Sequence, residues 1–295
     1  MCDKMKKYLI FTVASLLLMP SCLTKKEKPG ELTRTSGEVK LVTLDPGHFH
    51  AALVQKNSYK QVADEVYVYA PEGDDVQEHL NKINGYNTRT DSPTKWKEVV
   101  YLGSDFLEKM LSEKKGNVMI TAGNNGKKTE YIKQTLMAGI HVLADKPMAI
   151  NSENFGLLKE CFDIARGKGI LLYDIMTERH EITTVLQREL SCIPAVYGEQ
   201  LKGTPEEPAI VKESVHHFFK VVSGTPLKRP AWFFDVNQQG EGIVDVTTHL
   251  VDLVQWEAFP EQVIDYKKDI ELIDANRWTT SISPEEFKQV TGTEA

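Results

Sequence analysis

The sequence predicts an α/β fold in which a doubly wound parallel sheet is followed by a second, shorter α+β domain. Short runs of β-branched and other apolar residues alternate with helical patterns between residues 39 and 176. The alternation then stops, and an irregular stretch containing several prolines begins. Regular alternation of strand and helix produces parallel sheets with right-handed crossovers. Ligands of such sheets bind at the carboxyl ends of the strands.

The elements follow from the two hydrophobic periods. Brief apolar runs predict strands at residues 39–44, 65–70, 97–103, 117–122, 140–147 and 170–176. A period of 3.6 residues predicts helices between them at 48–56, 74–83, 104–114, 127–139 and 152–169. Beyond them we expect helices at 181–190 and 242–256 and an alternating strand at 263–278. The domains are therefore expected at 38–176 and 177–295, the second incomplete because little chain remains for a full sheet.

The first 22 residues have the pattern of an export signal. Three lysines precede an apolar stretch from Leu9 to Met19, which is too short to span a membrane. Cys22 closes the segment, as in a bacterial lipoprotein, where this cysteine is acylated; an ordinary signal peptide or an uncleaved anchor is the alternative. Residues 23–37 are polar and predict a flexible tether. We expect the protein in a bacterial cell envelope, lipid-anchored on the periplasmic side or at the outer membrane.

Charge and cysteine content exclude two classes of protein. The net charge is −7, and removal of the signal makes it more negative. An acidic chain repels phosphate backbones, so nucleic acid is not expected as a partner. Only Cys161 and Cys192 remain beyond the export signal and Cys22, which allows one disulfide but no disulfide framework.

The turn after the first strand, in "LDPGHFHAALV", resembles a nucleotide-binding loop only in part. Asp-Pro-Gly favours a tight turn into a helix, and a pyrophosphate binds at such a helix start. The fingerprint G-x-G-x-x-G is reduced to Gly47, however, with Asp45 at the first glycine position and His50 near the third. Two interpretations stay open: a degenerate nucleotide loop, or a structural β–α turn.

Two other strand ends carry polar groups. Glu72 or Asp74, after the second strand, could hold a ribose. Lys146 follows the fifth strand, and Pro147 restrains its backbone. A lysine at this edge can exchange a proton with a substrate hydroxyl. The alternative is a lysine that caps the strand end in solvent.

The helix at 242–256 carries a titratable stripe. Asp245, His249 and Asp252 stand at steps of four and three, so they share one helical face. A histidine beside carboxylates suits a general base and its orienting group. A buried structural histidine is one alternative, and a metal site using Asp245 and His249 is another.

Histidines and a tryptophan in the irregular stretch are candidate substrate contacts. Adjacent histidines of a strand point to opposite faces, so at most one of His216 and His217 can face a site. Trp232 could stack on a sugar ring, although core packing is an alternative use.

Two of these motifs together resemble one family. "NVMITAGNNGKKTEYIKQTLMAGIHVLADKPMAI" resembles the nucleotide-binding half of the Gfo/Idh/MocA oxidoreductases, whose motif ends in Glu-Lys-Pro; here the glutamate is Asp145. "GEGIVDVTTHLVDLVQW" is similar to their second motif, D-x-x-x-H-x-x-D. Both motifs occur in one chain in the family's order, and the resemblance covers residues 39–256.

The resemblance implies a Rossmann-like domain that binds NAD or NADP, and oxidation of a hydroxyl on a sugar, cyclitol or glycoside. In one branch of the family the cofactor is held and recycled through oxidation, elimination, addition and reduction of one glycoside. By position the resemblance implies the catalytic residues Lys146, Asp245 and His249. It implies cofactor contacts by Gly47, His48, Glu72, Ala122, Asn124, Asn125, Lys146 and Pro147. Substrate contacts are assigned to His217 and Trp232, no metal is expected, and a homodimer is expected from the family.

Three departures motivate an alternative function. The glycine fingerprint is largely missing, family members carry a longer sheet after the second motif, and free dinucleotide is scarce where an exported protein resides. A cofactor-free carbohydrate-binding or scaffold lipoprotein that retains the fold is therefore the second hypothesis. Metal-assisted hydrolysis through Asp245 and His249 is a third.

Overall fold

The computed structural model describes residues 35–222 and 225–295. The predicted export signal, Cys22 and most of the tether lie outside the described residues. Within the described part, no helix is long and apolar enough to cross a membrane. Cys161 is buried, Cys192 is exposed, and both are free thiols, so the disulfide that the sequence allows is not formed.

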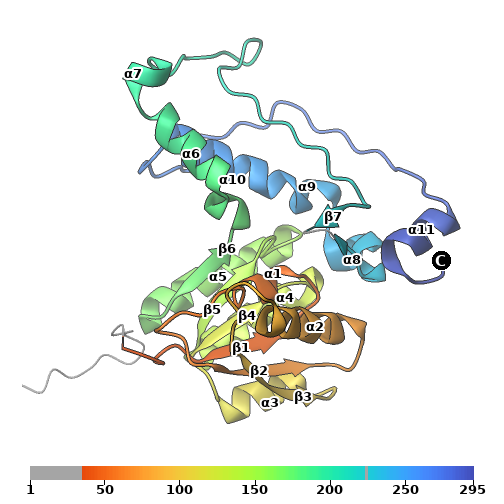
Figure 1. Cartoon of the computed structure of the whole chain (residues 1–295). Helices are drawn as coiled ribbons and strands as arrows, with labels where there is room; N and C mark the ends of the chain where they lie inside the picture. Colours follow the sequence, from red (N-terminus) through yellow and green to blue (C-terminus); the bar gives the residue numbers. More distant parts are fainter. Residues whose placement is uncertain (1–34, 223–224) are drawn as a thin grey trace, which may run out of the picture.

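Six parallel strands form one sheet at the base of the molecule (Figure 1). Its order is β3-β2-β1-β4-β5-β6, and every neighbouring pair is parallel. The strands are β1 (Leu41–Leu44), β2 (Glu65–Ala70), β3 (Lys97–Leu102), β4 (Val118–Thr121), β5 (His141–Asp145) and β6 (Leu172–Ile175). The order reverses between β1 and β4, the point where such sheets bind ligands. The predicted doubly wound parallel sheet is confirmed.

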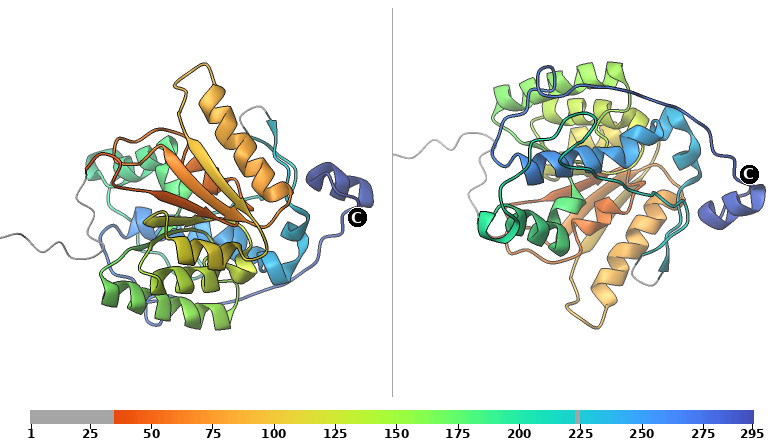
Figure 2. Two further views of the ribbon diagram at one scale, coloured as in Figure 1. Left: turned by 90° about the horizontal axis from the view of Figure 1, so that it is seen from below. Right: turned by 90° about the horizontal axis from the view of Figure 1, so that it is seen from above.

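Helices cover both faces of the sheet (Figure 2). One core cluster joins the sheet to α1 (His50–Leu53) and α2 (Asp74–Thr88). A second, on the opposite face, joins it to α3 (Phe106–Glu113), α4 (Asn125–Met137) and α5 (Ser152–Lys168). Alternation along β1 produces this division, because Leu41 belongs to the first cluster and Val42 to the second.

The second domain lies over the carboxyl ends of the strands, with α6 beside α10 (Figure 1). The expected helix at 242–256 is divided at Val246 into α9 and α10. The elements of this domain are η1 (Thr177–His180), α6 (Ile182–Ser191), α7 (Pro194–Tyr197), β7 (Val221–Val222), β8 (Thr225–Pro226), η2 (Ala231–Phe234), α8 (Val236–Gln239), α9 (Gly242–Asp245), α10 (Thr247–Ala258) and α11 (Pro284–Thr291).

The strand predicted at 263–278 was wrong. This segment pairs with no strand of the described residues, and Val263 and Trp278 are 96% and 79% exposed. Alternating apolar residues form a strand only where a neighbour accepts and donates the main-chain hydrogen bonds. The second domain has the expected shortened α+β form, since its described sheet is the two-stranded ribbon of β7 and β8.

Candidate active site

A cleft of about 730 Å³ opens between the sheet and the second domain. Its walls come from the turn between β1 and α1, the ends of β2 and β5, and the segments around η2 and α9. Lys146, Asp245 and His249 all line it, although they come from two domains. The structure therefore brings together the three residues assigned to catalysis.

Lys146 and Asp245 form a buried ion pair across the domain boundary. The lysine Nζ lies 2.9 Å from Oδ1 of Asp245 and 3.0 Å from its main-chain oxygen. His216 Nδ1 lies 2.9 Å from the other carboxylate oxygen. Burial alone would raise the pKa of Asp245, but the bond from His216 and the charge of Lys146 hold it well below its usual range. Asp245 is therefore ionised at neutral pH and fixes the lysine ammonium in the cleft.

His249 lies on α10, about one helical turn after Asp245. The residue is 8% exposed, and its Nδ1 has no hydrogen-bond partner in the described part of the chain. Burial, with smaller contributions from the charges of Lys146 and His50, lowers the pKa of His249 to about 4. The ring is consequently neutral at physiological pH and able to accept a proton.

Asp252, the third member of the predicted stripe, does not line the cleft. Its two carboxylate oxygens accept hydrogen bonds from Nε and a terminal nitrogen of Arg179 in η1. This contact anchors α10 to the segment that leaves the sheet, so Asp252 positions the helix that carries His249.

The turn between β1 and α1 is held by residues after β4. The N–H groups of Gly47 and His48 donate to the main-chain oxygen of Ala122 at 2.7 and 3.0 Å. Asn124 donates through Nδ2 to Asp45 Oδ2 at 2.7 Å. Ala122 and Asn124, assigned to cofactor contacts, therefore brace the turn and do not line the cleft.

Asp45, the residue at the first glycine position of the fingerprint, is buried against α4. Besides Asn124, the hydroxyl of Tyr131 donates to Asp45 Oδ2 at 2.9 Å. The backbone of Asp45 has a φ of 47°, in the left-handed region that favours glycine. Asp45 thus meets the conformational demand of the missing glycine, while its carboxylate is held by two donors.

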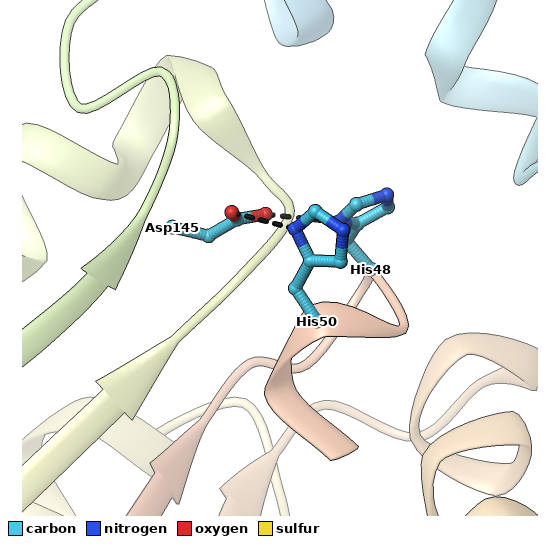
Figure 3. Close-up of side chains that lie close together, drawn as sticks. All are labelled: His48, His50 and Asp145. Carbon is cyan, nitrogen blue, oxygen red and sulfur yellow. Dashed lines mark hydrogen bonds and ion pairs between the residues drawn. The ribbon is translucent and has the colours of Figure 1, made fainter. Parts of the chain in front are cut away.

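His48 and His50 both approach Asp145 (Figure 3). Nδ1 of His48 lies 2.8 Å from Oδ2, and Nδ1 of His50 lies 2.9 Å from Oδ1. Burial alone would raise the pKa of Asp145, but these two bonds hold it well below its usual range. Burial lowers the pKa of His48 to about 4. His48 was expected to contact the cofactor, and its cluster with His50 and Asp145 was not expected from the sequence.

The remaining assigned residues divide between the cleft and its supports. Asn125 lines the cleft, and its side-chain oxygen accepts from the buried ammonium of Lys128 at 2.6 Å. Pro147, joined to Lys146 by a cis peptide bond, does not line the cleft; its main-chain oxygen also accepts from Lys128. Glu72 lines the cleft and is exposed.

The substrate contacts differ from the expectation at one position. Trp232 lines the cleft, and its Nε1 donates to Asp75 Oδ2 at 2.8 Å. His217 is exposed and lies outside the cleft lining, whereas its neighbour His216 lines it. Arg229 holds the His216 ring toward the cleft, because its terminal nitrogen lies 2.7 Å from Nε2 of His216. The same nitrogen lies 3.2 Å from the main-chain oxygen of His217 and makes no hydrogen bond to that ring in the described part of the chain.

Comparison with known proteins identifies the family. Residues 48–173 match the family model described as "Oxidoreductase family, NAD-binding Rossmann fold". Residues 186–295 match the model described as "Putative oxidoreductase C terminal domain". The chain belongs to the Gfo/Idh/MocA oxidoreductase family. No curated protein matches the sequence.

Two solved structures are similar to the chain. The chain is 78% identical to a "putative oxidoreductase from Parabacteroides merdae", with a TM-score of 0.84, over 90% of this chain and 60% of that one. A "putative oxidoreductase from Thermotoga maritima" is 15% identical with a TM-score of 0.51, over 74% of this chain and 58% of that one, and shares the fold. The chain therefore spans about 60% of the length of these proteins.

The cleft of this Gfo/Idh/MocA protein fits the NAD that the matched family model describes. Glu72 stands after β2, where ribose hydroxyls are bound in this fold. A Cβ at Gly47 would come within 2.9 Å of the Trp232 indole, so glycine at this position lets the indole pack against the turn. Both ring nitrogens of His79, a buried residue of the lining, have no hydrogen-bond partner in the described part. A polar ligand would satisfy them.

Proposed function

We propose that the protein is an NAD(P)-dependent oxidoreductase that acts on a hydroxyl of a sugar, cyclitol or glycoside. The observation that carries this proposal is the buried Lys146–Asp245 pair beside the neutral His249, whose Nδ1 has no hydrogen-bond partner among the described residues. These groups supply a fixed cation and a proton acceptor in one cleft. Trp232 adds an aromatic face to its lining, which suits a polyhydroxylated ring.

The residues divide the proton chemistry between them. The bound nicotinamide would accept a hydride from the carbinol carbon. Lys146 donates a hydrogen bond to the substrate oxygen, and Asp245 holds the ammonium in position. The neutral ring of His249 accepts the hydroxyl proton as the carbonyl forms. The C–H and O–H bonds thus break while the second C–O bond and an N–H bond on His249 form, and the hydride would be taken up by the nicotinamide. His216 keeps Asp245 oriented.

The first test is the cofactor content of the purified full chain. The protein is denatured, and the supernatant is analysed for nicotinamide dinucleotide by mass spectrometry. Near-stoichiometric release supports the proposal and favours a tightly held, recycled cofactor. If the folded protein releases none, binding of added NAD and NADP is measured by calorimetry, and failure of both overturns the proposal.

A cofactor-free carbohydrate-binding protein is the second candidate. One observation favours it: the N–H groups of Gly47 and His48, at the turn where this fold binds a pyrophosphate, already donate to Ala122. This candidate predicts carbohydrate binding by a folded chain that binds no dinucleotide and turns over no substrate. Turnover with any sugar in the presence of NAD would refute it.

We propose that the chain is exported and anchored by lipid at Cys22. The support is the sequence alone, namely the lysines and apolar stretch that precede this cysteine. Labelling of bacteria that express the full chain with a radioactive fatty acid should mark the protein. The label should disappear in Cys22→Ala and persist in Cys192→Ala, and equal labelling of the two variants would contradict the anchor.

A further inference from the structure

We propose that His48, His50 and Asp145 bind a divalent transition-metal ion, with zinc as the reference ion. The proposal departs from the sequence-based expectation of no metal, and it does not depend on the proposed oxidoreductase activity. Two imidazoles and one carboxylate are a ligand set of open zinc and non-haem iron sites. Their candidate ligand atoms all lie within 4.8 Å of one another.

The fold brings these side chains together from separate strands. His48 and His50 follow β1, Asp145 ends β5, and β4 lies between the two strands. The histidine turn must therefore cross the end of β4. Gly123, just after β4, permits this approach, because a Cβ there would lie 2.6 Å from the Cα of Gly47. The cluster thus joins the turn after β1 to the end of β5 (Figure 3).

The spacing is close to that of metal ligands. The two Nδ1–Oδ distances are 2.8 and 2.9 Å. Neighbouring ligand atoms of a tetrahedral zinc ion, at about 2.1 Å from the metal, lie roughly 3.4 Å apart. Each pair therefore needs to open by about 0.5 Å, which side-chain rotation can supply.

Nearby cations do not occupy the carboxylate of Asp145. The buried ammonium of Lys128 donates to the main-chain oxygen of Asp145 at 3.0 Å. The described hydrogen bonds of the Asp145 side chain are those with the two histidines. Lys146 is bound to Asp245. The carboxylate thus keeps lone pairs for an ion, because each of its oxygens accepts one hydrogen bond among the described residues.

The cluster is buried on one side and open on the other. The Asp145 side chain is 2% exposed, whereas that of His48 is 26% exposed, and all three residues line the cleft. An ion held here would have its remaining coordination positions toward the cleft, where an oxygen of a bound molecule can enter. That arrangement distinguishes an open site from a closed structural one.

The test uses the purified full chain, stripped of metal with a chelator and then titrated with zinc by calorimetry. We expect one zinc per chain, and at least 10-fold weaker binding in His50→Gln and in Asp145→Asn. His180→Gln removes an exposed histidine elsewhere and should bind as the wild type does. Equal zinc affinity in His50→Gln and His180→Gln, or no zinc bound by the wild type, would overturn the site.

A second measurement uses the wild type alone, so it tests the proposal even if the variants fail to fold. Diethyl pyrocarbonate modifies accessible imidazoles, and mass spectrometry locates the modified residues. Zinc should protect His48, the more exposed histidine of the cluster, while His180 is modified equally with and without the ion. Unchanged modification of His48 in saturating zinc would contradict the proposal. Dinucleotide content is measured separately, so a failed metal site and a failed oxidoreductase assignment give different results.

Discussion

The Nζ of Lys146 lies 2.9 Å from Oδ1 of Asp245, a residue 99 positions away in the sequence. Lys146 follows β5 and Asp245 ends α9, so this one contact joins the sheet to the second domain. Their side chains are 9% and 12% exposed. A buried charge that loses its partner is costly, typically about 3–5 kcal/mol. The pair therefore couples the integrity of the fold to the geometry of the cleft.

Lys146→Met should lower the free energy of unfolding by about 3 kcal/mol, because it leaves the Asp245 carboxylate with His216 as its described side-chain partner. Urea denaturation measures the change. Lys133→Met is the matched control, since Lys133 pairs with the exposed Glu160 on the surface and should contribute little. Equal destabilisation by the two substitutions would show that the buried pair has no special role.

The parallel sheet could be predicted from local patterns, whereas the convergence of Lys146, Asp245 and His249 was expected only from the resemblance to the Gfo/Idh/MocA family. Hydrophobic periodicity defined the strands, and parallel strands place their carboxyl ends at one edge. The break at Val246 was not visible, because residues 242–256 keep one apolar pattern throughout. The strand at 263–278 failed for a different reason: alternation reports two faces but not the presence of a neighbouring strand.

The cluster of His48, His50 and Asp145 could not be predicted from spacing. A His-x-His after the first strand and an aspartate at the end of the fifth were visible signals. Their meeting depends on how far one turn crosses the end of β4, and Gly123 controls that approach. The choice of His216 over His217 likewise depends on Arg229, a contact between irregular segments.

If His249 is the proton acceptor, kcat/KM should begin to fall on the acid side only at low pH. Burial lowers the pKa of His249 to about 4, so the ring remains unprotonated, and competent as a base, until the pH falls toward that value. The logarithm of kcat/KM should therefore be flat near pH 6.5 and fall near pH 4. His249→Asn should lower kcat by about 10²–10⁴-fold. A limb near 6.5 in the wild type would indicate an exposed histidine or another base.

Stability should fall as the pH rises through neutrality because of Glu98. Burial raises the pKa of this carboxyl from 4.5 to about 7, although a hydrogen bond from Gln55 opposes the shift. The folded state thus holds the proton more tightly than the unfolded state between these values. The contribution of Glu98 to the free energy of unfolding is complete below about pH 4.5 and is lost as the pH rises through 7.

Glu98→Gln should remove this dependence, because a neutral amide can still accept from Gln55. We expect the variant to be more stable than the wild type at pH 8 by about 1–3 kcal/mol and to show a flatter stability profile between pH 5 and 8. Urea denaturation at several pH values measures both. A wild-type profile with the same slope as that of the variant would exclude Glu98 as the titrating group.

Gly123→Ala should separate the turn after β4 from the turn after β1, which carries the histidines of the proposed zinc site. Gly123 has a φ of 101°, and its added Cβ would lie 2.6–2.8 Å from three backbone atoms of Gly47, which cannot rotate away. Strain at such a position costs of order 1–3 kcal/mol, before the clash is counted. The substitution should therefore destabilise the fold and weaken zinc binding together, because the histidine turn is displaced from Asp145.

Gly156→Ala is the control for this prediction. Gly156 lies within α5, has no positive φ, and an added Cβ there would meet nothing within 4 Å. Alanine is favoured over glycine in a helix interior by roughly 0.5–1 kcal/mol, so this variant should gain stability and bind zinc as the wild type does. If Gly123→Ala retained wild-type zinc affinity and stability, the close contact between the turns could not be what positions His48 and His50.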